Sequence, residues 1–318
     1  MPDTTVPTQG PGPYQAPGPF PGGPGLGPGP RADVIHDIGY RHYDGPRLGR
    51  SYAVRSLYLQ TLRGSFGLGR SVKSKILPMF LAGVMCVPAL IVVAVAVYTK
   101  MTKLPIDYAH YLSVMEFVIA VFVASQAPAA FSRDLRFMTI PLYFSRPLGA
   151  GDYVRAKFAG MASAAFLLTG LPMLVLWLGA VLSSMSFGHQ TEHFLFGLVA
   201  AACYAVLYAA IGSLIAASTP RRGFGVAAII AVLLISEAIS GIVWAVLARG
   251  GADVSARWAS VLSPAQLVDS ITTWLFHLGG ATGPTGAPST AGGIVMLAEL
   301  VAISAGCYAL LVHRYRSL

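Results

Sequence analysis

Long apolar runs alternate with short polar segments along most of this chain. Each of six runs has about the twenty residues that an α-helix needs to cross a hydrocarbon core of about 30 Å. The runs cover residues 76–98, 111–131, 158–182, 194–218, 224–247 and 294–312. The pattern therefore predicts an all-α membrane protein with six transmembrane helices.

Composition agrees with a membrane protein and narrows the choice of partners. Hydrophobic residues make up 55% of the 318 residues and charged residues only 11%, with a mean hydropathy of +0.64, whereas soluble domains have about 25% charged residues. The net charge of +9 would suit nucleic-acid binding if the basic residues shared one soluble domain. Most of them adjoin the apolar runs instead. We therefore expect membrane lipids, and no nucleic acid, as partners.

The polar connections predict the orientation of the spans. Lys and Arg concentrate before the first run, in residues 132–157, in the turn at residues 219–223 and in the C-terminal tail. Because cytoplasmic loops carry the excess of positive charge, both termini are expected in the cytoplasm.

Three regions are expected along the chain. Residues 1–32 are rich in Pro and Gly with almost no charge, so they cannot build a core and are predicted to be disordered. Residues 33–75 form a cytoplasmic segment, and residues 76–318 form the six-span domain. Within the second region, four apolar side chains recur every fourth residue: Val54, Tyr58, Leu62 and Phe66. This spacing predicts an amphipathic connecting helix at the inner membrane surface.

A short outer helix is expected between the fifth and sixth spans. Ser263-Pro264 is a typical helix start, with Ser as the N-cap and Pro at the first helical position. At about fourteen residues the helix is too short to span a membrane, so it should lie at the outer interface or dip in and return. One face is apolar, and the other is polar: Gln266, Asp269, Ser270 and Thr273.

Three acidic residues lie inside predicted spans: Glu116, Glu237 and Glu299. Counted from the outer ends at 1.5 Å per residue, all three fall roughly 8 to 15 Å below the outer surface. Charges within a membrane usually face the bundle interior and mark a pathway, so the three are candidates for an acidic belt along a substrate path, which would suit cations or cationic amphiphiles. The alternative is that each is protonated or bonded to a neighbour, such as Ser236 or Ser240, and serves packing.

Two motifs suggest chemistry but lack the surroundings that it needs. Residues 67–74 approach a phosphate-binding loop, yet Val72 replaces the required second glycine and no buried strand precedes it. His189, Glu192 and His193 fit the H-x-x-E-H zinc-protease pattern, but they are expected in a short outer loop without a third ligand or a water-excluding domain. We therefore expect no catalytic residue, metal or cofactor in this chain; a membrane metalloenzyme is the less favoured alternative.

The segment between the second and third spans has the most distinctive pattern. Residues 133–136 are charged and predict a helix that Pro141 should stop after about two turns. Residues 142–144 (Leu-Tyr-Phe) then form an apolar knob, and Asp152 can cap the start of the third span. A helix with an apolar knob beside the membrane suits an apolar cleft on a soluble partner.

In this order the features resemble the permease family of type-2 ABC transporters. There, a charged helix after span two leads into a leucine/tyrosine-rich run, then Ser-Arg-Pro, then Tyr-Val and a Lys that opens span three. This chain has Leu142-Tyr143-Phe144-Ser145-Arg146-Pro147, then Asp152-Tyr153-Val154 and Lys157. The similarity covers residues 52–316 and includes the connecting helix, a Gly-Ser pair with a basic turn after span four, and the outer helix. One departure is Met138-Thr139, where the family often has Gly-Thr.

The resemblance implies that residues 133–144 are a coupling helix seated in a cleft of a soluble ATP-binding subunit. The implied contact residues are Arg133, Asp134, Arg136, Leu142, Tyr143, Phe144 and Arg146. It further implies a multi-pass protein of the bacterial plasma membrane, in which two permease copies or paralogues enclose a path. The partner would hold ATP and Mg²⁺ and power export of an unidentified substrate. A non-transporting membrane anchor for a soluble partner is the alternative.

Overall fold

A computed structural model gives the fold and describes residues 45, 48–69, 71–101, 103–145, 148–183, 185–219, 221–278 and 286–317. The chain divides into two compact units, Met1–Pro46 and Arg47–Leu318. All the helices below belong to the second unit. The Pro/Gly-rich tail and the contact residue Arg146 lie outside the described residues.

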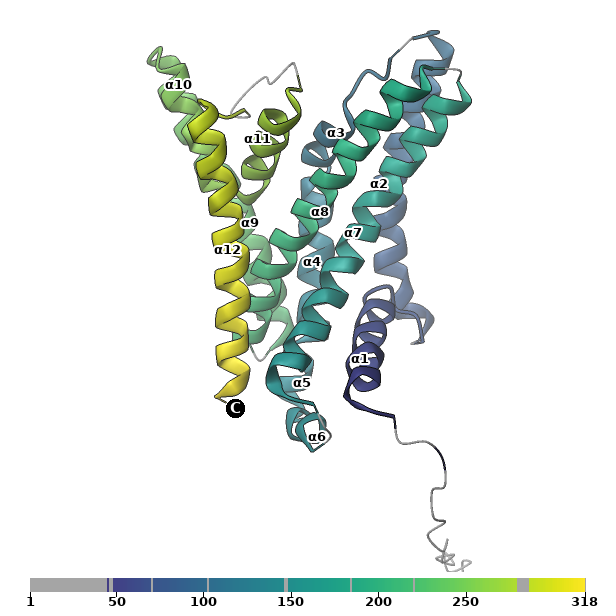
Figure 1. The fold of residues 1–318 in the computed structure, drawn as a ribbon, viewed down its shortest axis with the longest axis vertical. Helices are drawn as coiled ribbons and strands as arrows, with labels where there is room; N and C mark the ends of the chain where they lie inside the picture. Colours follow the sequence, from purple (N-terminus) through teal and green to yellow (C-terminus); the bar gives the residue numbers. More distant parts are fainter. Residues whose placement is uncertain are drawn as a thin grey trace, which may run out of the picture. The chain divides into compact units, whose positions relative to one another are not determined.

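The described part of the chain is helical and contains no strand (Figure 1). Its elements are α1 (Arg50–Ser65), α2 (Val72–Tyr98), α3 (Tyr108–Val114), α4 (Glu116–Ala130), α5 (Ser132–Arg136), α6 (Ile140–Phe144), α7 (Ala150–Leu182), α8 (Phe187–Ser218), α9 (Arg222–Arg249), α10 (Asp253–Ala256), the 3₁₀ helix η1 (Arg257–Leu262), α11 (Pro264–Phe276) and α12 (Thr290–Arg316).

Five helices are long and apolar enough to cross a membrane: α2, α7, α8, α9 and α12. By length and composition, the chain is thus a multi-pass membrane protein. The predicted second span is not one straight helix, because the chain breaks at Met115, and α3 is bent by 63° against the helical stretch Glu116–Arg136, which contains α4 and α5. Together they form either a broken span or a re-entrant segment.

The spanning helices are longer than the apolar runs that predict them. For example, α8 begins at Phe187, so His189, Glu192 and His193 lie in its first two turns and not in a loop. Apolar runs mark only the part of a helix that can contact lipid. Polar residues that tolerate helical geometry extend the helix beyond that part.

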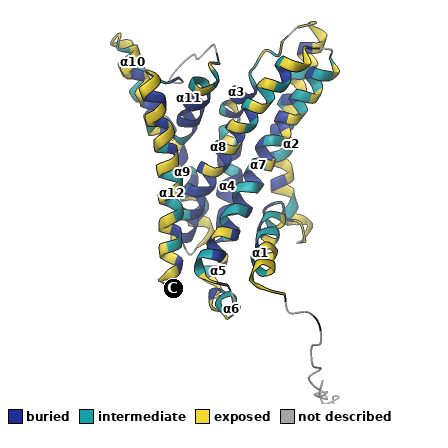
Figure 2. Ribbon diagram, viewed as in Figure 1, coloured by how far each residue is buried: buried dark blue, intermediate teal, exposed yellow. Residues whose placement is uncertain are grey.

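The centre of the bundle is formed by α7 and α8. α7 packs along α8, α1 and α2, while α8 also contacts α12, α4, α3 and α11. Where α8 crosses α4, a Cβ on Gly212 would lie 2.4 Å from Val123, so only a small residue permits this approach, as is common between membrane helices. Figure 2 shows buried residues along the facing sides and exposed residues on the outward sides of α2, α9 and α12.

The connecting helix α1 packs against α7. Its fully buried residues are Leu57, Thr61 and Ser65, and the four predicted stripe residues are half-buried beside them. The Tyr58 hydroxyl donates to Ser163 Oγ at 3.0 Å. A helix therefore lies where the stripe predicts one, with its buried face rotated slightly because the nearest contact is a neighbouring helix.

Candidate functional site

The segment between α4 and α7 forms two short helices with a sharp turn between them. α5 ends after Arg136 because Met138 takes a left-handed conformation, φ 48°. In this closing turn the Thr139 N–H donates to the Asp134 carbonyl at 3.1 Å, as in a Schellman motif. The prediction that Pro141 stops the charged helix is wrong. Pro141 instead lies in the first turn of α6, where a backbone N–H would have no partner within the helix, so its absence in proline has no cost. Met138 thus has the backbone conformation that glycine adopts most easily.

A buried ion pair anchors α5 to α7. Asp134 accepts hydrogen bonds from Lys157 Nζ and from the Tyr153 hydroxyl, the latter at 2.9 Å. Lys157 also donates to the Ala130 carbonyl. A buried charge is stable only when it is paired and hydrogen-bonded. The carboxylate of Asp134, expected among the partner contacts, therefore faces the bundle.

The predicted aromatic knob also faces partly inward. The rings of Tyr143 and Phe144 lie 5.4 and 6.2 Å from that of Tyr153. Tyr153 in turn contacts Tyr315 at the end of α12, at 5.1 Å. These aromatic contacts connect α6 to both α7 and α12.

An exposed surface remains on α5, α6 and the turn between them, and we call it the docking patch. Its apolar members are strongly exposed: Phe137 (65%), Met138 (80%) and Leu142 (69%). Arg133 and Arg136 are exposed beside them. Phe137 and Met138 were not among the predicted contact residues, although an apolar pair directly after a charged helix was the signal for them.

Asp152 connects the start of α7 to α1. It accepts a hydrogen bond from the Gly149 N–H at 3.4 Å, as a capping residue should, and others from Arg50 Nε at 2.6 Å and Arg155 Nη2 at 3.0 Å. The hydrogen bond that the Arg50 guanidinium donates to Asp152 raises the pKa of Arg50. The predicted cap is therefore confirmed, and it also ties α1 to the spanning helix.

A groove of about 680 Å³ runs beside α1, next to the docking patch. Arg55, Arg63 and Arg133 line it, together with Tyr52 and Leu59. None of the three arginines has a carboxylate within salt-bridge distance in the part of the chain that the structure describes. The groove thus presents positive charge.

At the other end of the bundle, Glu237 of α9 holds α11 in place. Its Oε1 accepts from Gln266 Nε2 at 2.5 Å, and its Oε2 accepts from the Ser263 hydroxyl. Ser263 also accepts from the Gln266 N–H at 3.5 Å, which confirms its predicted role as N-cap. These contacts support the packing alternative for Glu237, with partners on α11 and not on its own helix.

α11 is buried on both faces. It contacts α8, α9, α12 and α3, and even its polar residues Gln266, Asp269 and Ser270 are less than a tenth exposed. Ser270 Oγ accepts from the Gly286 N–H at 3.1 Å. The polar face of α11 therefore turns toward other helices. These helices supply the hydrogen-bond partners that the polar face of an interfacial helix would find in water.

Three carboxylates come together around α11, and we call them the acidic cluster: Glu116, Glu237 and Asp269. Glu116, the first residue of α4, lies close enough to the other two for their charges to interact. No hydrogen bond or ion pair engages the carboxylates of Glu116 or Asp269 within the described residues. Glu299, the third predicted belt residue, is half-buried on α12 and takes no part in these interactions.

Asp269 was not predicted to be part of the belt, although its place on the polar face of the short helix was the available signal. Burial raises the pKa of its carboxyl to about 6, with His110 of α3 opposing and Glu237 adding to the rise. This residue belongs to α11, which is not a candidate span. Asp269 thus changes charge in the mildly acidic range.

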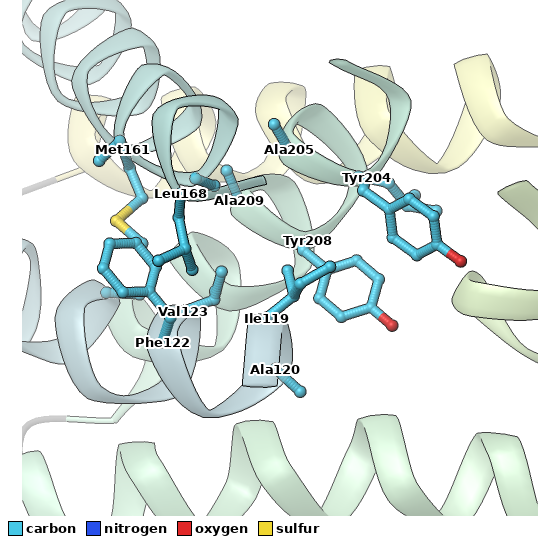
Figure 3. Close-up of a cluster of buried hydrophobic side chains, with 14 of the residues drawn as sticks. Ile119, Ala120, Phe122, Val123, Met161, Leu168, Tyr204, Ala205, Tyr208 and Ala209 are labelled. Carbon is cyan, nitrogen blue, oxygen red and sulfur yellow. The ribbon is translucent and has the colours of Figure 1, made fainter. Parts of the chain in front are cut away.

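Two tyrosines of α8 border the acidic cluster, and Figure 3 shows their hydroxyls pointing to the same side of the helix. Tyr204 donates to the Ala265 carbonyl at 3.1 Å. Tyr208 is 3% exposed, and its hydroxyl has no hydrogen-bond partner among the described residues. The charges of Glu116 and Glu237 both act on it. Tyr208 therefore presents an unused polar group to the cluster.

The histidine motif has a different surrounding. The rings of His189 and His193 lie 4.2 Å apart on successive turns of α8, and His193 Nδ1 is 3.4 Å from Asp107 Oδ1. Across the described ranges, no three His, Cys, Asp or Glu side chains are close enough to hold one metal ion. The three carboxylates of the acidic cluster are likewise not close enough together to hold one metal ion.

Comparison with known proteins adds no assignment. No protein-family model matches the chain, and no curated protein shows a significant match to it.

Proposed function

We propose that this protein is the transmembrane permease subunit of a type-2 ABC transporter, an exporter of the bacterial plasma membrane driven by ATP hydrolysis on a separate subunit. In this proposal, α3 and α4 together form one of six spans, and α1, α5, α6 and both termini face the cytoplasm. Two permease copies, or two related permeases, enclose the substrate path. ATP and Mg²⁺ are bound by the partner subunit.

The observation that carries the proposal is the docking patch. Phe137, Met138 and Leu142 expose apolar surface that water would not favour, and Arg133 and Arg136 lie at its edge. Apolar residues with Arg are typical of the centre of a protein–protein contact. The patch occupies the same place in the chain as the coupling segment of the family that the sequence resembles. A soluble ATP-binding subunit is therefore the partner we assign to it.

The contacts behind the patch suit the transmission of force. Asp134 joins α5 to α7 through Lys157 and Tyr153, and α6 reaches α12 through the aromatic contacts of Tyr153 with Tyr315. A displacement of the patch would move α7 and α12 with it. ATP can drive such a displacement because it binds one arrangement of the partner subunits more tightly than another.

Co-purification tests the proposal. The chain would be co-expressed in turn with each ATP-binding subunit encoded in the same organism, and one of them should form a stable complex. The double variant Phe137→Asp, Leu142→Asp should reduce its capture by at least tenfold, since the buried centre of an interface carries most of the binding energy.

The matched control is Val254→Asp, which changes an exposed apolar residue (63%) of α10, at the opposite end of the bundle from α5 and α6 (Figure 1), and should leave capture unchanged. If no subunit binds, or if the double variant binds as well as the wild type, the proposal is wrong. Stimulation of the partner's ATPase activity by the reconstituted complex would separate a transporter from a non-transporting anchor.

A further inference from the structure

We infer that the acidic cluster binds an organic cation, together with Tyr208. If the proposed function holds, the cargo of the transporter is then a cationic molecule. The inference names the substrate class of that function, but the binding site can be tested on this chain alone.

The first step is the imbalance of charge. Asp269 is 4% exposed, and neither it nor Glu116 has a hydrogen-bond donor within the described residues. The basic side chain whose charge acts on Asp269 is His110, while Glu237 adds a third carboxylate. Carboxylates that are buried without donors cost free energy. A bound cation would remove that cost.

The second step is the unused hydroxyl of Tyr208. This side chain is also nearly buried and points to the same side of α8 as Tyr204, whose hydroxyl reaches α11 (Figure 3). A tyrosine oxygen can accept a hydrogen bond from an ammonium group. Tyr208 lacks a protein partner but lies within range of two carboxylates, which is the arrangement that a protonated amine would satisfy.

The third step is access. The side-chain atoms that are fully enclosed and lack a partner are Ser213 Oγ, Ser304 Oγ and the Tyr315 hydroxyl, for the part of the chain described. The carboxylate of Asp269 and the hydroxyl of Tyr208 are not among them. Both groups are therefore nearly buried, but each keeps a small solvent-accessible area.

The size of the cation follows from the spacing of the carboxylates. They are too far apart to coordinate one metal ion, since metal–oxygen distances of about 2.0–2.6 Å would be needed. A larger cation with delocalised charge or several N–H donors suits the carboxylates of Glu116 and Asp269, which have no donor, while Glu237 is already bonded to Ser263 and Gln266 and contributes only its charge. The rings of Tyr204 and Tyr208, 5.7 Å apart, add aromatic surface of the kind that organic cations favour.

Equilibrium binding to the full chain in nanodiscs of uncharged phosphatidylcholine tests the inference, with empty nanodiscs as the baseline. The probes are tryptamine and tetraphenylphosphonium, and tryptophol is the neutral analogue of tryptamine. We expect saturable binding of at least one cation and none of tryptophol. Asp269→Asn and Glu116→Gln should each weaken binding by about tenfold or more, and Tyr208→Phe should weaken tryptamine more than tetraphenylphosphonium, which has no N–H.

Glu299→Gln is the matched control, because it neutralises an acid on α12 that does not interact with the cluster. Thermal unfolding of the empty variants separates binding from structure: Asp269→Asn should not lower the melting temperature. The inference is overturned if neither cation binds saturably, if tryptophol binds equally, or if Glu299→Gln has the same effect as Asp269→Asn. The binding assay contains no ATP-binding subunit. A negative result in this assay therefore does not affect the co-purification result, and failed co-purification does not affect the binding result.

Discussion

Asp134 and Asp269 are both nearly buried carboxylates, but their surroundings differ. Asp134, between α5 and α7, is paired with Lys157 and accepts a hydrogen bond from Tyr153, whereas no donor reaches Asp269 on α11 within the described residues. A paired charge stabilises one arrangement of helices, while an unpaired buried charge is costly and is relieved by a proton or by a bound organic cation. The comparison separates a structural joint from a candidate ligand site.

The largest effect should come from breaking the pair. Lys157→Met would leave the Asp134 carboxylate buried without its cation and should reduce the free energy of unfolding by about 3–5 kcal/mol. Unfolding in detergent micelles with a graded denaturant measures this loss. Adding Asp134→Asn to Lys157→Met should recover part of the lost stability, because it removes the unpaired charge. The effects of substitutions at two residues in contact are not additive. Equal stability of Lys157→Met and the wild type would show that this pair is no joint.

A smaller effect is expected at the attachment of α11. Glu237→Ala removes the acceptor for both Ser263 and Gln266 and should destabilise the protein by about 2 kcal/mol, the sum of two modest hydrogen bonds. In this variant, hydrogen exchange of the backbone amides of α11 should become faster relative to the wild type, by more than that of the amides of α8. The control Glu299→Gln should change neither quantity. Unaltered exchange in α11 would mean that Glu237 does not hold this helix.

The smallest effect concerns pH and the charge of Asp269. Because its pKa is raised from 3.8 to about 6, the empty protein binds an extra proton between these values, and this contribution to stability is lost as the pH rises through 6. Cation binding should show the opposite trend and weaken about tenfold per pH unit below 6, since only the ionised form attracts the cation.

Titrating binding from pH 7.5 to 5 in the wild type and in Asp269→Asn checks this expectation. The other groups that face the cluster are His110 of α3, Glu116 of α4, Tyr204 and Tyr208 of α8, and Glu237 of α9. The pH dependence should flatten in the variant. An identical slope in both proteins would assign the titration to one of these other groups.

Several local features could be predicted because their causes lie within a few residues. The start of α11 at Ser263-Pro264 and the cap at Asp152 both depend on a side chain three residues from its partner. The turn at Met138 could not be predicted in this way. A non-glycine residue adopts a left-handed conformation only when the packing around it makes up for the strain, and here α5 and α6 are both anchored to α7.

The docking patch and the acidic cluster show the same division between features with local causes and features that depend on packing. The sequence identified residues 133–144 as a surface segment and Glu116 and Glu237 as acids within spans, but it placed Asp134 outward and left Asp269 out of the belt. Side-chain direction on so short a helix depends on which neighbour supplies a partner, and here Lys157 and Tyr153 of α7 do so.

Hydropathy and charge, summed along the chain, determined by themselves that this is a helical membrane protein and, except for the broken second run, which segments form its long helices. They could do so because the cost of placing polar groups in lipid is set residue by residue. Only the tertiary structure decided which buried charges are paired. Pairing depends on the few ångströms that separate side chains on different helices, as in the meeting of Asp269 with Glu116 and Glu237, and no local pattern encodes that distance.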